Sequence, residues 1–225
     1  MKTPLMLLAA VSLVPLGSAQ ISKQSAGYLF RNKYTAGQTN KFLMSLVSTA
    51  GGQTLLKMET PLVMKTKSVS KGIATLDVAT GPAKMNGQSQ GKVDRQTVKM
   101  DTRNRPVGGS SNFESFGTFA FPEKAIKPGS TWKQKIDMAS AVGNIKLDAV
   151  YTFVGVKTVG GKSVAEIRTT MKGNMMGPIT GTATSFLRVA DGSVDSSAVK
   201  LIMNVTAGEG QTPQKVVSDV KVIRQ

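Results

Sequence analysis

Apolar and polar residues alternate along most of this chain, and this period of two is the feature that most restricts its fold. The clearest case is the segment 145–153, in which Ile145, Leu147, Ala149, Tyr151 and Phe153 share one side. Alternation over such a length is typical of a β-strand with one buried face. No segment beyond Gln20 carries the 3.6-residue apolar stripe of an amphipathic helix. The pattern therefore predicts a fold made almost entirely of strands.

Further alternating segments cover residues 74–78, 132–138 and 199–205. Glycine-rich turn signals separate the predicted strands, at 50–52, 71–72, 142–144, 160–162 and 191–193. Many short strands with regularly spaced turns are typical of antiparallel all-β folds. We therefore predict an all-β protein whose antiparallel strands form two similar halves, arranged as a barrel, a half-barrel or a sandwich.

The expectation of two halves comes from a phrase that occurs twice. The residues Gly-Gln-Thr-Asn-Lys at 37–41 return as Gly-Ser-Thr-Trp-Lys at 129–133, each time after an aromatic residue and a lysine. Glycine can adopt the positive φ that turns a chain into its next strand. We interpret the phrase as a turn-to-strand junction that opens each half of one compact domain. The predicted halves are residues 20–110 and 111–225, with the loop-like segment 104–116 between them.

The first nineteen residues have the pattern of a secretory signal peptide. Lys2 is followed by an apolar stretch from Leu5 to Leu16 and by the small residues Gly17-Ser18-Ala19. This order of charge, apolar stretch and small residues is typical of a cleaved export signal. No later segment is apolar over the roughly 20 residues that a transmembrane helix needs. We expect an exported protein of the periplasm, the cell envelope or the extracellular space, without a transmembrane segment.

The chain contains neither cysteine nor histidine. Disulfides, cysteine nucleophiles, Ser–His–Asp triads and ordinary zinc sites are therefore excluded. Histidine is also the most frequent general acid–base residue in enzymes. The sequence offers no catalytic residues, no metal site and no cofactor site, so we expect a protein that is not an enzyme.

The predicted mature chain is strongly basic, with 28 basic and 13 acidic side chains and a formal charge of +15. Such a charge favours encounters with polyanions but does not select among them. The densest basic region lies around a predicted strand in which Lys99, Asp101, Arg103 and Arg105 share one face. The candidate polyanion-binding residues are Lys92, Arg95, Lys99, Arg103 and Arg105. Their partner would be a nucleic acid, an anionic lipid or membrane surface, or a wall polymer.

Ten of the twelve methionines lie beyond residue 19, whereas aromatic residues are few. Methionine fills irregular spaces and adapts to varied partners. One interpretation is a pliable apolar cavity lined by residues such as Met44, Met100, Met138 and Met203. The other, which periodicity alone favours, is the ordinary filling of a β-core.

The second copy of the repeated phrase lies within the segment 121–132, Phe-Pro-Glu-Lys-Ala-Ile-Lys-Pro-Gly-Ser-Thr-Trp. This segment resembles a phrase found in a family of uncharacterised exported bacterial β-proteins. In its first half the chain departs from that pattern, because Asn40 stands where the family has an aromatic residue. The resemblance implies no site residues, since the family has none assigned. A more distant resemblance, by analogy, is to lipoprotein-carrier folds, in which an antiparallel sheet curls into a half-barrel around acyl chains.

These observations lead to a principal and an alternative hypothesis for function. In the first, the protein is a non-enzymatic binding or carrier protein for a lipid or another apolar or amphipathic ligand. In the alternative, it is a cationic surface protein that binds polyanions. The first predicts apolar side chains around a ligand space, and the second predicts a continuous basic surface.

Overall fold

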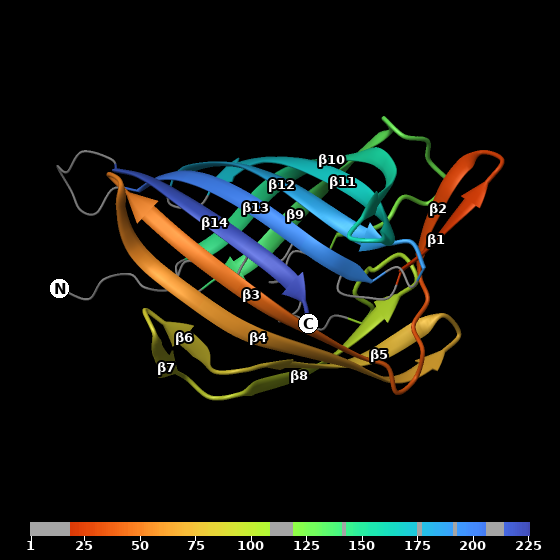
Figure 1. The fold of residues 1–225 in the computed structure, drawn as a ribbon, viewed down its shortest axis with the longest axis horizontal. Helices are drawn as coiled ribbons and strands as arrows, with labels where there is room; N and C mark the ends of the chain where they lie inside the picture. The colour runs from red at the N-terminus through yellow and green to blue at the C-terminus, as the bar shows by residue number, and fades with distance from the viewer. Residues whose placement is uncertain (1–18, 109–118, 141–142, 175–176, 191–192, 206–213) are drawn as a thin grey trace.

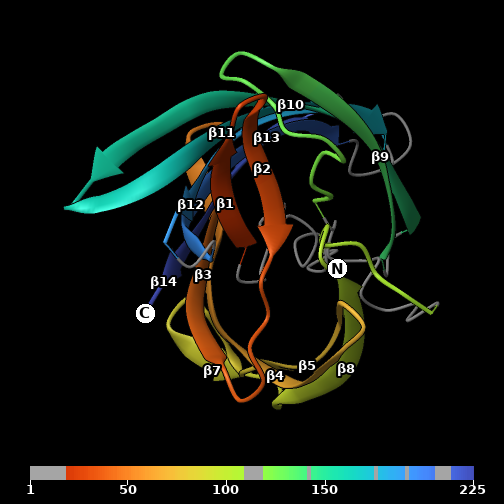
Figure 2. The same ribbon diagram turned by 90° about the vertical axis from the view of Figure 1, so that its right-hand side faces the viewer.

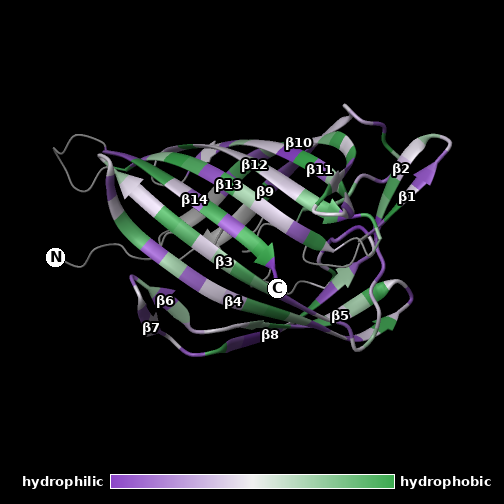
Figure 3. Ribbon diagram, in the orientation of Figure 1, coloured by the Kyte–Doolittle hydropathy of each residue, from purple (hydrophilic) through white to green (hydrophobic). Residues whose placement is uncertain are grey.

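The computed structural model describes residues 19–108, 119–140, 143–174, 177–190, 193–205 and 214–225. Every regular element in these ranges is a β-strand (Figure 1). Bands of apolar and polar residues alternate along the strands, as the sequence predicted (Figure 3). The all-β prediction is therefore confirmed, whereas the predicted signal peptide lies almost wholly outside the described residues.

Strands β1 (Ala19–Gln24) and β2 (Gly27–Asn32) form a separate antiparallel hairpin. The other strands belong to one large antiparallel sheet. Its first half contains β3 (Thr39–Ala50), β4 (Gln53–Ser70), β5 (Ile73–Thr80), β6 (Ala83–Met85), β7 (Gln88–Gln90) and β8 (Asp94–Asp101). Its second half contains β9 (Thr131–Ser140), β10 (Gly143–Val159), β11 (Lys162–Asn174), β12 (Pro178–Arg188), β13 (Val194–Val205) and β14 (Gln214–Arg224).

The large sheet curls without closing. From β3 the order runs through β14, β13, β12, β11 and β10 to β9, so the C-terminal strand β14 lies between β3 and β13. In the other direction β4 follows β3, with β5 and then β8 at one end of β4 and β6 and β7 at the other. Among the described strands, β8 pairs only with β5 and β9 only with β10. Viewed from one end, the sheet surrounds a concave side and the β1–β2 hairpin lies over that end (Figure 2).

One face of every long strand points to the concave side. The strand register aligns these inward residues into rows that cross the sheet. One row consists of Trp132, Tyr151, Thr169, Ala183, Val199, Val220, Leu46, Met58 and Met85, from β9 to β6. Most of the row is apolar, so the core of the protein lies on the concave side of the sheet.

The repeated phrase forms the same turn in both places. Gly37 and Gly129 have φ of 83° and 86° and precede β3 and β9. The amide of Gly37 donates to Thr66 O (2.8 Å), and that of Gly129 donates to Phe153 O (2.7 Å). Both accepting residues lie at an irregularity in the strand register. The phrase is a structural junction before a strand in both places, whereas the division into two similar halves at 20–110 and 111–225 stays a prediction.

The outer face carries an ion cluster around a buried carboxylate. Glu166 of β11 has a side chain only 6% exposed, and its carboxylate contacts Lys157 Nζ at 2.7 Å and Arg168 Nε at 2.8 Å. The hydrogen bond from Lys157 lowers the pKa of Glu166 most, and Arg168 lowers it further. Lys157 also lies 4.7 Å from the ring centre of Phe186, a cation–π arrangement. The cluster joins three neighbouring strands, β10, β11 and β12.

We expect Glu166 to stabilise the fold above its unfolded-state pKa, which is about 4.3. Because its pKa is lowered in the folded protein, this contribution is lost as the pH falls through the folded value. Glu166→Gln should reduce the free energy of unfolding by about 1 kcal/mol at pH 7 and by less at acid pH. Urea unfolding at pH 7 and pH 3.5 measures this. Glu59→Gln is the control, and an equal loss for both variants at pH 7 would contradict the assignment.

Candidate binding site

The concave side has partly exposed apolar surface over β3, β4 and β6. Met44, Met58, Leu62 and Met85 are only partly buried there and pack against the core. Met58 is the cross-strand partner of Leu46 on one side and of Met85 on the other. These thioether and branched side chains lie on the inward face, with Thr60 between Met58 and Leu62 on β4. We call these four residues the methionine patch.

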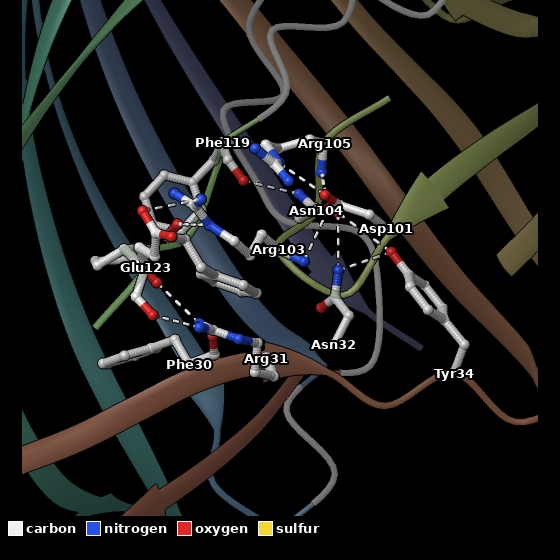
Figure 4. A network of polar contacts seen from close by, with 12 residues as sticks. Phe30, Arg31, Asn32, Tyr34, Asp101, Arg103, Asn104, Arg105, Phe119 and Glu123 are labelled. Atoms are coloured by element: carbon white, nitrogen blue, oxygen red, sulfur yellow. Dashed lines mark hydrogen bonds and ion pairs between the residues drawn. The ribbon is translucent and has the colours of Figure 1, made fainter. Parts of the chain in front are cut away.

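One end of the half-barrel is tied by three chain segments: β2, the turn at 101–105 and the segment 119–126. We call this arrangement the clasp (Figure 4). Tyr28 and Ile126 exchange backbone hydrogen bonds of 2.7 and 3.0 Å. Asn32 N donates to Thr102 O at 2.6 Å. The third link, Phe121 N to Arg103 O at 2.9 Å, joins the other two segments. Each segment is therefore bonded to both of the others.

The guanidinium of Arg31 strengthens the clasp through backbone carbonyls. It donates to Phe30 O at 2.7 Å, to Pro122 O at 2.9 Å and to Glu123 O. Burial lowers the pKa of Arg31, and the nearby charge of Arg103 lowers it further. Arginine stays protonated in proteins, so its charge is retained. Arg31 thus serves as a fixed link between β2 and the segment 119–126.

A buried amide network lies beside Arg31. Asn32 Nδ2 donates to Tyr34 Oη at 2.7 Å and to Asn104 Oδ1 at 3.0 Å. Asn104 Nδ2 in turn donates to Phe119 O at 2.9 Å. Burial raises the pKa of Tyr34, which stays neutral. These bonds join the same three segments in the interior.

The clasp also corrects the expectation of a strand through Arg105. Strand β8 ends at Asp101, and Asn104 has a φ of 62°, which does not fit a strand. Asp101 Oδ1 accepts hydrogen bonds from the amides of Arg103 and Arg105, both 2.8 Å long. An aspartate that bonds amides two and four residues later favours a turn over an extended chain. The four charged residues therefore do not form one strand face.

An aromatic cluster fills the interior next to the clasp. Phe30 of β2 contacts Phe121 and Phe153, with ring centres 5.8 and 5.1 Å apart. Phe119 lies 4.5 Å from the ring centre of Tyr151. Trp132 stacks on Tyr151 at 5.3 Å, and its Nε1 donates to Ala120 O at 3.1 Å. As the chain has a single tryptophan, its fluorescence reports on this cluster.

Three buried polar atoms in the described part of the chain have no hydrogen-bond partner. They are Tyr151 Oη, Asn32 Oδ1 and Thr60 Oγ1. Tyr151 and Thr60 point inward from opposite stretches of the curled sheet, on β10 and β4. Buried polar groups in proteins are normally paired, so each unpaired atom calls for an explanation.

The predicted polyanion-binding residues do not share one environment. Lys92, Arg95 and Lys99 are exposed, on or just before β8. Arg103 Nε donates to Phe121 O at 3.0 Å, whereas Arg105 Nε bonds Asp101 Oδ2 at 2.6 Å. The structure therefore separates three exposed cations from two that take part in the clasp.

The predicted cavity methionines lie on separate strands. Met44 on β3 is partly buried in the methionine patch, whereas Met100 on β8 and Met203 on β13 are buried in the core. Nothing is described of the Met138 side chain. Sequence reasoning missed the clasp and the aromatic cluster. The one signal for the clasp was a pair of polar residues, Asn32 and Asn104, beside strands whose inward positions are apolar.

None of the described residues form a group of acidic side chains suited to a metal ion. The described ranges also contain no helix long and apolar enough to cross a membrane.

No protein-family model and no curated protein matches the sequence. Among solved structures, the chain is similar to lipovitellin in a study of its lipid–protein interactions, with 10% identity and a TM-score of 0.43. That match covers 86% of this chain but only 25% of the lipovitellin chain. A protein described as exported, with a YmcC-like fold, from Bacteroides fragilis matches at 10% identity over 85% of this chain and 95% of its own, with a TM-score of 0.41. A DUF1329 family protein from Desulfovibrio piger matches at 12% identity over 84% of each chain, with a TM-score of 0.25.

A substitution at Gly27 tests how closely the clasp is packed. A Cβ on Gly27 would lie 2.4 Å from Ile126 O, and φ is 135°. We expect Gly27→Ala to separate β2 from Ile126 and to lower the free energy of unfolding by about 3 kcal/mol, at the upper end for a strained backbone position. Thermal unfolding followed by Trp132 fluorescence measures this.

Gly37→Ala is the matched control for Gly27→Ala. Gly37 also has a positive φ, but no atom lies within 4 Å of the added Cβ. Gly37→Ala should therefore lower the free energy of unfolding by only about 1 kcal/mol, because only the backbone conformation is strained. An equal loss for both variants would mean that the contact with Ile126 contributes nothing.

Proposed function

We propose that this protein is an exported, non-enzymatic binding or carrier protein that holds an apolar or amphipathic ligand against the concave face of its half-barrel. The observation that carries the proposal is the largely apolar lining of that face, with the partly buried methionine patch as its accessible part. Methionine side chains adapt to ligands of varied shape.

The layering of the described elements supports this proposal. Sheets normally bury their apolar face against a helix layer or a second sheet. Here the described ranges contain no helix, and the only strands outside the large sheet are the short β1–β2 hairpin. The apolar lining extends from β9 to β6, well beyond the end where the hairpin lies. Most of this lining is already buried, so a bound apolar molecule would cover its partly exposed portion, the methionine patch.

The free energy gained by burying methylene groups favours a ligand with a long apolar part. Each buried methylene group contributes about 0.8 kcal/mol, so ten of them supply about 8 kcal/mol. The cost of association takes up a large share of this gain. A short apolar molecule would therefore bind weakly, whereas a lipid-sized chain has enough surface to bind with useful affinity.

The polyanion hypothesis has less support from the geometry. Of its five candidate residues, Arg103 and Arg105 are engaged by the clasp. The other three remain exposed near β8 and contribute to the general basic charge. This charge accounts for encounters with anionic surfaces, but the structure does not single out a polyanion site.

The direct test is native mass spectrometry of the protein purified from its natural host, combined with binding of the fluorescent apolar dye N-phenyl-1-naphthylamine. We expect a lipid to accompany the protein, and we expect added lipid to displace the dye. A protein that carries no lipid and neither binds the dye nor releases it to lipid would refute the proposed function.

Two adjacent residues of β3 locate the binding face. Met44 points inward, with Val222 and Thr60 as cross-strand partners, and Ser45 points to the outer face. Met44→Lys should weaken dye binding at least about tenfold, because an ammonium group is costly to bury against apolar surface. Ser45→Lys adds the same charge and should change binding less than about twofold. Equal effects in two folded variants, checked by circular dichroism, would place the ligand elsewhere.

A further inference from the structure

Tyr151 carries a hydroxyl that the described protein leaves without a partner. Its side chain is fully buried at 0% exposure, on the inward face of β10. Trp132 stacks on the ring, and Phe119 meets it edge-on at a centre distance of 4.5 Å. Phenylalanine would make the same ring contacts without burying an unpaired O–H group. A buried hydroxyl without a partner is costly, so this group calls for a partner outside the described residues.

Tyr34 is a second buried tyrosine and serves as the comparison for Tyr151. Its hydroxyl is also buried, but it accepts a hydrogen bond of 2.7 Å from Asn32 Nδ2. Burial raises the pKa of both tyrosines, so both hydroxyls are neutral. Of the two buried hydroxyls, only that of Tyr34 has a partner within the described protein.

A second unpaired atom lies near the same aromatic cluster. Asn32 Oδ1 is buried and accepts no hydrogen bond, although Nδ2 of the same side chain donates two. Asn32 is linked through Asn104 to the carbonyl of Phe119, whose ring contacts Tyr151. The clasped end of the interior thus offers one hydroxyl, which can donate or accept, and one oxygen that can only accept.

We propose that this end of the half-barrel holds the polar head of the ligand, with Tyr151 as the hydrogen-bonding anchor, and that the head is an uncharged group carrying O–H. The inference rests on the proposed function, because it assigns an orientation to the same apolar ligand. A hydroxyl head has the chemistry to pair with both atoms, since it can accept from Tyr151 Oη and donate to Asn32 Oδ1. The apolar chain then extends along the inward rows towards the methionine patch.

The charges of the clasp argue against an anionic head. The guanidinium of Arg31 is directed at the carbonyls of Phe30, Pro122 and Glu123, and that of Arg103 at the carbonyl of Phe121. A carboxylate or phosphate has no proton to give to Asn32 Oδ1, and burying its charge without a cation is costly. An ester without a hydroxyl can accept from Tyr151 but leaves Asn32 unpaired. The geometry thus favours lipids with a hydroxyl head over lipids with an anionic head and over esters that lack a hydroxyl.

The first test compares Tyr151→Phe with Tyr34→Phe in the ligand-free protein. We expect Tyr151→Phe to unfold at the same temperature as the wild type or at a higher one, because it removes an unpaired buried hydroxyl. We expect Tyr34→Phe to unfold at a lower temperature, because it breaks a buried hydrogen bond. A lower unfolding temperature for Tyr151→Phe would show that its hydroxyl has a partner within the protein, which would overturn the proposal.

The second test measures displacement of N-phenyl-1-naphthylamine by three probes with the same oleoyl chain. They are 1-monooleoylglycerol, methyl oleate and sodium oleate, used below their aggregation limits. For the wild type we expect monooleoylglycerol to act at about tenfold lower concentration than the other two, which corresponds to one additional net hydrogen bond. In Tyr151→Phe this preference should fall to about twofold or less, while methyl oleate should change little.

The outcomes separate this inference from the proposed function. If all three probes displace the dye equally, or if Tyr151→Phe keeps the wild-type preference, the polar anchor is wrong and the carrier proposal stands. If oleate is preferred, the head is anionic and the uncharged assignment is wrong. If no probe displaces the dye, or if the dye does not bind, the proposed function itself fails.

Discussion

The half-barrel depends on backbone hydrogen bonds that hold an unclosed sheet in a curl. The described strands β8 and β9 each pair on one side only, and the chain has no cysteine to join the ends covalently. The clasp connects chain that follows β8 to chain that precedes β9 and ties both to β2. Its bonds lie among buried aromatic rings, where exclusion of water makes each polar contact costly to break. The concave side exists because these contacts keep the two edges of the sheet in place.

The period of two assigns different physical roles to the two faces of the sheet. Inward positions supply apolar rows, and outward positions carry much of the basic charge together with the ion cluster at Glu166. The long apolar lining and the high positive charge are therefore compatible in one small protein. An apolar ligand would meet the inner face, whereas anionic surroundings would meet the outer face.

The unpaired hydroxyl of Tyr151 and the patch around Met58 suggest how affinity and selectivity are divided. Apolar burial supplies most of the free energy of binding and discriminates poorly among chains of similar length. A single hydrogen bond contributes less but rejects head groups that leave buried atoms unpaired. One end of the interior would then select the head, and the methionine patch would tolerate variation in the chain. This division suits a carrier that serves a class of lipids.

The sequence by itself determined that the fold consists of strands with one apolar face, and it marked the two matched turns at Gly37 and Gly129, because alternation and glycine conformation are local properties. It also excluded chemistry that needs cysteine or histidine. Only the tertiary structure decided that the sheet curls without closing and that Asn32, Asn104 and Phe119 meet. Seventy-two residues separate the two asparagines, and no local pattern encodes such a contact. The unpaired state of Tyr151 is likewise a property of its surroundings, since alternation predicts a buried ring but not the neighbours of its hydroxyl.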